Sequence, residues 1–221
     1  MYVTSRLVWR SVKPTRPSLN DKPTTNMRDL IVSKSIELFL RTSYKATSIR
    51  HITDALGITK GAFYWHFKSK DELLLTVIEK YHNEFLERLY AHMEVFEGTF
   101  MRRFREYHKY INEYAREHGE LCVLFVTLAA EMAGSRTMAE RRIKGVQEQY
   151  RSFIESLLIL GKNEGLFEAT YDVTLNAHII IAVHSGILLQ WYMNKREIDG
   201  PSIARAYRDV ILYGMVAKGT S

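Results

Sequence analysis

The side chains best suited to chemistry lie in one short run, Thr59–Phe67, which reads Thr-Lys-Gly-Ala-Phe-Tyr-Trp-His-Phe. At about 100° per residue of helix, Phe63 and Phe67 share one inward face. Tyr64 and Trp65 then point to the opposite side, where two aromatic side chains would not contribute to the protein core. A phenol hydroxyl suits contact with a phosphate, and a flat ring suits a sugar or a thymine methyl. The run therefore indicates a surface for double-stranded DNA.

Gly61 supports the same interpretation, because glycine inside a helix costs about 1 kcal/mol relative to alanine. Glycine is used despite this cost where another molecule must come close to the backbone, because it has no side chain in the way. The alternative is that Gly61 and the neighbouring aromatic residues pack against the rest of the protein, in which case the run has no binding role.

The elements that must position this run are short helices joined by a tight turn. Ser48 opens a helix with Ile49, Ile52 and Leu56 on one face, and Gly57 ends it. Thr59 can cap the next helix, 60–66, so that residues 48–67 form a helix-turn-helix. Such a unit places its second helix in the major groove of DNA.

The remaining pattern is helical as well. A Thr24–Asn26 cluster precedes a helix at 27–41, and Ser69 caps one at 70–93. Further helices are predicted at 99–117, 120–133, 136–163, 172–195 and 201–217, with breaks at glycines. We therefore predict an all-α fold, an N-terminal three-helix helix-turn-helix domain joined to a larger helical ligand-binding and dimerisation domain. The expected segments are a basic, disordered tail at 1–26, a DNA-binding domain at 27–85 and an effector-binding and dimerisation domain at 86–221.

Composition and charge agree with this plan. The chain has 221 residues, 46% hydrophobic and 25% charged, with a net charge of +6. Residues 1–26 carry five basic residues against one acidic, residues 27–85 nine against seven, and residues 86–221 seventeen of each. The excess positive charge at the N-terminal end favours an anionic partner there. The tail holds three of the four prolines. A transit peptide, or a true start at Met27, remains an alternative reading of it.

Residues 27–85 resemble the DNA-binding domain of the TetR family of bacterial transcriptional regulators (TetR/AcrR-like). The resemblance is strongest over Gly57–Leu73, where the aromatic helix is followed by Lys-Ser-Lys-Asp-Glu-Leu. Ser43 and Ser35 depart from the family pattern, which has glycine and alanine there. The matching positions are Ile31, Leu38, Phe39, Tyr44, Thr47, Ile52, Gly57, Lys60, Gly61, Tyr64, His66, Phe67, Lys70 and Leu73.

The resemblance implies that the third helix reads the operator. Phosphate contacts are expected from Tyr64, His66 and Lys70, and second-helix contacts from Ser48 and Arg50. Thr59 and Lys60 stand where side chains reach base edges. The predicted DNA-binding residues are thus Ser48, Arg50, Thr59, Lys60, Gly61, Tyr64, Trp65, His66 and Lys70.

Residues 172–195 carry two apolar seams on opposite faces, so both faces must be covered. One seam is predicted as a homodimer interface and consists of Leu175, Ile179, Ala182, Gly186, Leu189 and Met193. The other, Ala177, Ile181, His184, Leu188 and Trp191, is predicted to face the subunit core. A fully buried helix in a monomer is the alternative. The family also implies an effector pocket for a small apolar or amphipathic molecule, with candidate lining residues Phe104, Tyr107, Phe125, Met132, Phe153 and Trp191.

Other chemistry finds little support in the sequence. Cys122 is the single cysteine, the histidines show no metal-ligand spacing, and no nucleophile or phosphate-loop motif occurs. His108 and His184 are interpreted as satisfied helix residues. We expect no enzyme activity, no cofactor, no metal and no membrane partner. The predicted function is a cytoplasmic, ligand-responsive repressor that binds a palindromic operator as a homodimer, the alternative being a non-specific architectural DNA-binding protein.

Overall fold

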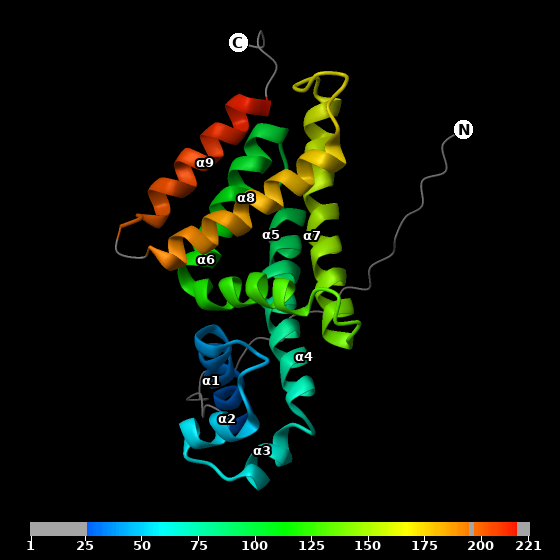
Figure 1. The fold of residues 1–221 in the computed structure, drawn as a ribbon. Helices are drawn as coiled ribbons and strands as arrows, with labels where there is room; N and C mark the ends of the chain where they lie inside the picture. Colours follow the sequence, from blue (N-terminus) through cyan, green and yellow to red (C-terminus); the bar gives the residue numbers. More distant parts are fainter. Residues whose placement is uncertain (1–25, 195–196, 216–221) are drawn as a thin grey trace, which may run out of the picture.

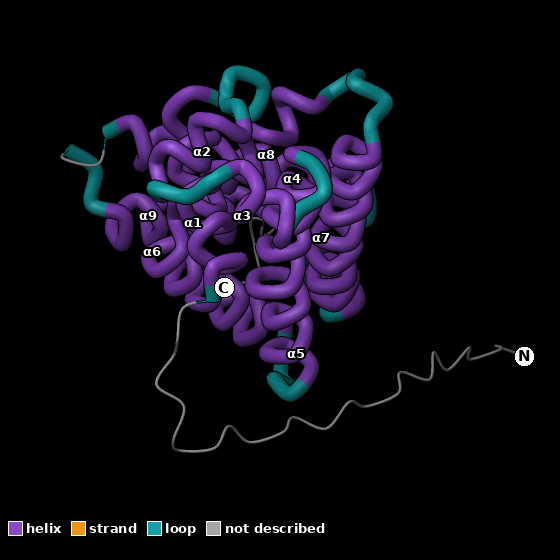
Figure 2. Tube along the Cα trace, turned by 90° about the horizontal axis from the view of Figure 1, so that it is seen from below, coloured by secondary structure: helices purple, strands orange, loops and turns teal. Residues whose placement is uncertain are grey.

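The computed structural model describes residues 26–194 and 197–215, and this part of the chain is built from helices and short loops without a strand (Figure 2). The all-α prediction is therefore confirmed. The predicted tail, apart from Asn26, lies outside the described residues. The helices are α1 (Met27–Thr42), α2 (Ile49–Leu56), α3 (Lys60–His66), α4 (Lys70–Tyr81), the π-helical segment η1 (His82–Glu87), α5 (Arg88–Glu94), α6 (Phe100–Met132), α7 (Met138–Asn163), α8 (Val173–Met193) and α9 (Gly200–Met215).

Polar side chains begin the first four helices where the sequence predicts them. Asn26, Ser48, Thr59 and Ser69 each accept a hydrogen bond from a backbone N–H of the first turn. Gly57 ends α2 with φ +65°, a left-handed conformation that glycine adopts without strain. These caps make α2 and α3 short and fix the turn between them.

Two helices differ from the prediction. The expected helix 70–93 contains the π-helical turn η1, which inserts an extra residue into the helical register. The expected pair 99–117 and 120–133 runs as one helix, α6, bent at His118, whose φ and ψ of −124° and 29° are not helical. The structure therefore has a kink at His118 where the sequence predicts a break between two helices.

Figure 1 shows two parts joined by α4, which runs upward from the small blue and cyan part into the larger one. We call α1 to α3 with the first half of α4 the head, and the remaining helices the body. Beyond its kink, α6 lies across the lower end of the body and packs on α1. The head has its own buried centre, to which Ile31, Phe39, Ile52, Phe63 and Leu73 contribute.

Candidate DNA-binding surface and ligand cavity

The head buries one face of α3 and leaves the other open. Phe63 and Phe67 are 0% and 1% exposed, whereas Tyr64 and Trp65 are 52% and 86% exposed. The predicted orientation of this helix is therefore confirmed. An indole that is almost wholly in solvent contributes little to the fold, which leaves it free to contact another molecule.

Nothing among the described residues requires glycine at position 61. A Cβ atom built on Gly61 would have only the Thr59 Oγ1 atom nearby, at an ordinary 3.6 Å. The alternative that Gly61 packs against the rest of the protein is therefore wrong. The absence of a side chain keeps the start of α3 open to a molecule outside the chain.

The other residues predicted to bind DNA lie on α2 and α3 or at their first turns. Lys60 is exposed and forms no ion pair or hydrogen bond with the described residues. The Arg50 side chain has one ion pair among the described residues, an exposed contact with Asp54 at 3.4 Å. The hydroxyls of Ser48 and Thr59 are engaged as helix caps, and His66 is half-buried. Contact of these residues with DNA stays a prediction.

Lys70 has a role inside the head that the sequence did not indicate. Its Nζ donates to the carbonyl oxygens of Tyr44 and Thr47, at 2.9 and 2.8 Å, and lies 4.2 Å from the centre of the Tyr44 ring. Partial burial lowers the pKa of the Lys70 ammonium. Two of its three N–H donors thus hold the turn between α1 and α2, and one remains for a phosphate.

A Lys70→Ala variant is therefore expected to lose stability as well as affinity for DNA. Leaving two half-buried carbonyls without their charged donor should lower the free energy of unfolding by about 2 kcal/mol. Lys68→Ala is the matched control, because it removes a neighbouring exposed charge that makes no side-chain bond to the described residues. Thermal unfolding should separate the two variants. Equal melting temperatures for both would mean that the internal bonds of Lys70 do not stabilise the head.

A carboxylate of the body holds the same turn from the other side. Glu131, near the end of α6, accepts hydrogen bonds from the backbone N–H groups of Tyr44 and Lys45, at 3.1 and 2.7 Å. Tyr44 also donates its hydroxyl hydrogen to Asp71. The turn between α1 and α2 is thus the place where the head is fastened to α6.

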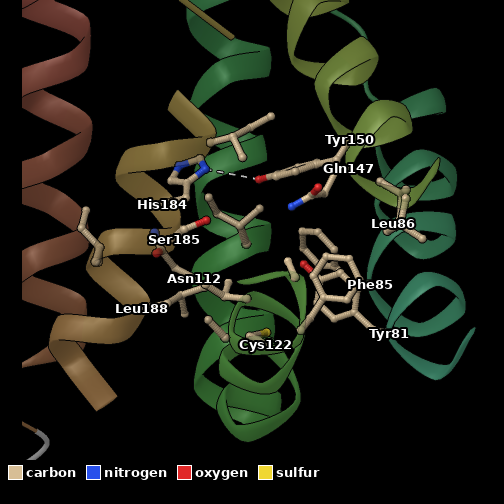
Figure 3. A pocket seen from close by; sticks show the side chains of 18 of the residues that line it. Tyr81, Phe85, Leu86, Asn112, Cys122, Gln147, Tyr150, His184, Ser185 and Leu188 are labelled. Carbon is tan, nitrogen blue, oxygen red and sulfur yellow. Dashed lines mark hydrogen bonds between the residues drawn. The ribbon is translucent and has the colours of Figure 1, made fainter. Parts of the chain in front are cut away.

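The body contains a cavity between α4, η1, α6, α7, α8 and α9, with about 960 Å³ of empty space when the solvent at its opening is included. We call it the inner chamber (Figure 3). Its wall is mainly apolar, and the described residues that line it include no Lys, Arg, Asp or Glu. Burial raises the pKa of the lining Cys122 thiol to about 12, so that this group also stays neutral.

A second, more polar hollow adjoins the inner chamber, and the two share Asn112, Ala115, Ile187, Leu188 and Ala204. We call it the mouth. Its wall contains four basic and three acidic side chains: Lys109, Arg116, Arg205, Arg208, Glu113, Glu197 and Asp199. Lys109 and Arg116 are seven residues apart on α6, which places them on one face of the helix, and neither forms an ion pair with the described residues.

The six residues predicted to line a pocket are placed differently from one another. Phe125 lines the inner chamber, where it stacks on Tyr81 with 4.0 Å between ring centres, and Trp191 lines the mouth. Phe104, Tyr107, Met132 and Phe153 line neither hollow and are buried in the core. Large side chains fill space, so the chamber lies where residues such as Ala115, Ala129 and Ser185 leave it open.

The two seams of α8 have the orientations expected for them. Leu175, Ile179 and Met193 are 56%, 46% and 76% exposed, Ala182 and Gly186 are also exposed, and Leu189 is half-buried. On the other seam Ala177 is buried, and Ile181, His184, Leu188 and Trp191 are half-buried against the body. One apolar face of α8 is therefore left uncovered by the described residues of the single chain.

The described residues contain no group of three or more His, Cys, Asp or Glu side chains that could hold a metal. An outward aromatic helix in a helix-turn-helix, carried by a helical body with a neutral chamber, defines a DNA-binding regulator. Residues 31–77 match the family model of bacterial regulatory proteins of the tetR family, and residues 79–214 match that of the YsiA-like protein, C-terminal region. The chain belongs to the TetR family of transcriptional regulators.

Relatives of the chain include the transcriptional repressor KstR2 of Mycobacterium tuberculosis, 24% identical over 203 residues that cover 87% of this chain and 94% of the relative. The MbdR regulator from Azoarcus sp. CIB has a similar structure, with a TM-score of 0.79, 23% identity and coverage of 87% of this chain and 100% of that one. The regulator FadR from Bacillus subtilis, solved in complex with stearoyl-CoA, gives a TM-score of 0.69 at 17% identity, with 84% and 98% of the chains covered.

Proposed function

We propose that this regulator is a homodimeric repressor that acts in the cytoplasm. Each subunit places α3 in the major groove of one half of a palindromic operator. A small amphipathic effector, an acyl thioester of coenzyme A, enters the inner chamber and releases the protein from DNA. The observation that carries the DNA-binding part of this proposal is the exposed face of α3, with Trp65 86% exposed.

Different residues of the head would contribute in different ways. Lys60 lies at the start of α3, exposed and without a partner among the described residues, where a side chain reaches base edges. Tyr64, one turn further along, presents a hydroxyl suited to a phosphate. Base contacts carry sequence information and phosphate contacts do not, so the two residues are separable by experiment.

Lys60→Ala is expected to weaken binding to an operator by about 5- to 150-fold, and to weaken binding to random DNA far less. Tyr64→Phe should weaken both by a similar factor. The operator is obtained by selection from a randomised duplex library, and both duplexes are titrated at two salt concentrations.

Both variants must melt close to the wild-type temperature, since neither side chain is buried. An equal loss on both duplexes for Lys60→Ala would assign Lys60 to the phosphate backbone and leave Arg50 as the candidate for base contact. Wild-type protein without preference for any selected sequence would instead favour the architectural alternative.

The uncovered face of α8 supports the homodimer. By length and composition α8 could cross a membrane, with 21 residues and a mean hydropathy of 1.4 over an 18-residue stretch. It nevertheless packs on α6, α7 and α9, and its outer face carries small residues at Ala182 and Gly186. A second copy of α8 would cover this face and come close at the small residues.

The two hollows of the body support the amphipathic effector. An apolar acyl chain suits the uncharged inner chamber, and anionic phosphates suit Lys109 and Arg116 at the mouth. The similar fold of FadR holds stearoyl-CoA. Adding stearoyl-CoA to the protein–operator complex should raise the dissociation constant for DNA, and stearate, which lacks the phosphates, should act far more weakly.

A further inference from the structure

Three polar side chains from three helices meet beside the inner chamber. Tyr107 of α6 and Tyr150 of α7 have their hydroxyl oxygens 2.5 Å apart. The Nδ1 atom of His184, on α8, lies 3.2 Å from the first and 3.3 Å from the second. Figure 3 shows the contact between His184 and Tyr150 at the wall of the chamber. We call these residues the polar triad.

All three members are neutral. Burial raises the pKa of both tyrosine hydroxyls and lowers the pKa of the His184 imidazole, to which nearby His108 adds a smaller effect. The other ring nitrogen of His184, Nε2, is buried and has no hydrogen-bond partner among the described residues. His184 is therefore not the satisfied helix residue that the sequence suggests. The same interpretation is wrong for His108, whose Nε2 atom is also buried without a partner among the described residues.

The unpartnered Nε2 atom indicates where the imidazole proton lies. A buried N–H without an acceptor is rarer in proteins than a buried acceptor without a donor. This difference places the proton on Nδ1, which then donates to a tyrosine oxygen and cannot accept.

The triad then has one donor too many. Between the two hydroxyls there is room for one hydrogen bond, in which one hydroxyl donates to the other. The Nδ1–H group of His184 donates to one of the two oxygens and accepts nothing. One hydroxyl hydrogen is left without an acceptor inside the triad. Tyr107 is wholly buried and does not line the chamber, whereas Tyr150 does, so the surplus donor belongs to Tyr150.

The chamber limits what this donor can meet. No basic side chain lines it among the described residues, so a carboxylate bound there would lack a counter-charge. A neutral oxygen, such as a carbonyl, carries no such cost. We propose that the Tyr150 hydroxyl donates a hydrogen bond to the carbonyl oxygen of the effector's thioester, with Tyr107 and His184 as positioning residues. This inference rests on the acyl-thioester effector proposed above.

The test compares two probes of equal chain length, stearoyl-CoA and S-octadecyl-CoA, in which a methylene replaces the carbonyl. Calorimetric titration of the full chain should give wild-type protein an affinity about tenfold higher for stearoyl-CoA. Tyr150→Phe should abolish this preference by weakening stearoyl-CoA alone. Tyr107→Phe should reduce the preference several-fold, because the Tyr150 oxygen then loses the hydroxyl that donates to it.

Tyr207→Phe is the matched control. Tyr207 also lines the chamber, but its hydroxyl donates to the backbone oxygen of Ile180 at 3.4 Å, outside the triad. This variant should keep the wild-type preference, whatever its effect on overall affinity.

Equal affinities of the wild type for the two probes, or an unchanged preference in Tyr150→Phe, would overturn the proposal while leaving the acyl-thioester effector standing. If neither probe binds the wild type, the effector class is wrong and the proposal falls with it. The wild-type comparison decides the matter even if a variant fails to fold.

Discussion

A Gly186→Leu variant is expected to sediment as a monomer whose subunit is still folded, as judged by an unchanged helical circular-dichroism spectrum. Gly186 lies on the exposed face of α8, and a Cβ atom built there has no atom of the described residues within 4 Å, apart from its own chain neighbours and helix backbone. A leucine therefore fits the single subunit and, as a better helix former, adds about 0.8 kcal/mol. In a dimer related by two-fold symmetry the added bulk occurs twice, which weakens association by on the order of a hundredfold or more.

Loss of the dimer should also lower the affinity for DNA. Two heads held together bind two half-sites with a combined affinity that exceeds that of one head by about 10²- to 10⁴-fold. Gly186→Leu should lose most of this gain on a palindromic operator, and little on a single half-site.

Gly145→Leu serves as the matched control, because a Cβ atom built on Gly145, on α7, also has no neighbouring atom within 4 Å in the part of the chain that the structure describes. Sedimentation of this variant should match the wild type. A Gly186→Leu protein that stays dimeric at micromolar concentration would place the dimer interface elsewhere.

Glu131→Ala is expected to loosen the head from the body. It removes two charge-assisted hydrogen bonds to backbone N–H groups, which at this half-exposed position lowers the free energy of unfolding by about 2 kcal/mol. For a chain of this size the melting temperature should fall by about 4–8 °C. Calorimetry should show the head and body unfolding with less cooperativity than in the wild type.

The same variant should respond less to its effector. Without the two bonds from Glu131, a change in the body reaches the head through fewer contacts. The loss of operator affinity that we propose for stearoyl-CoA should therefore shrink several-fold. Glu120→Ala removes an exposed carboxylate from the same helix and should leave both properties unchanged. An unaltered melting temperature and an unaltered response would mean that Glu131 does not join the two parts.

Local signals in the sequence predict the head well. The capping residues Asn26, Ser48, Thr59 and Ser69 act within three residues of themselves, so their role depends little on the rest of the fold. Ser43 stands where the family has glycine, and its φ of +72° lies in the left-handed region that favours glycine. The family pattern thus predicts the backbone of this turn even though the residue differs. The inward and outward faces of α3 and α8 follow directly from helical periodicity.

The cavity and its polar groups could not be predicted in the same way. Glu131 is 87 residues from Tyr44, and Tyr107 is 77 residues from His184, so each pair depends on how whole helices pack. A cavity forms where side chains do not fill the space between helices, and a search for the largest aromatic residues finds core residues such as Phe104 and Phe153 instead. Nor does the sequence of residues 82–87 show the extra residue that makes their turn π-helical.

The Glu131 carboxylate accepts hydrogen bonds from the backbone N–H groups of Tyr44 and Lys45 rather than from their side chains. Any amino acid except proline presents the same N–H, so the two bonds to Glu131 do not themselves depend on the side chains at positions 44 and 45. These two bonds therefore depend on the backbone conformation of the turn and not on its side chains. An exchange of heads between family members would have to preserve the backbone of this turn for the two bonds to Glu131 to form. Such exchanges would pair one body with heads for different operator sequences.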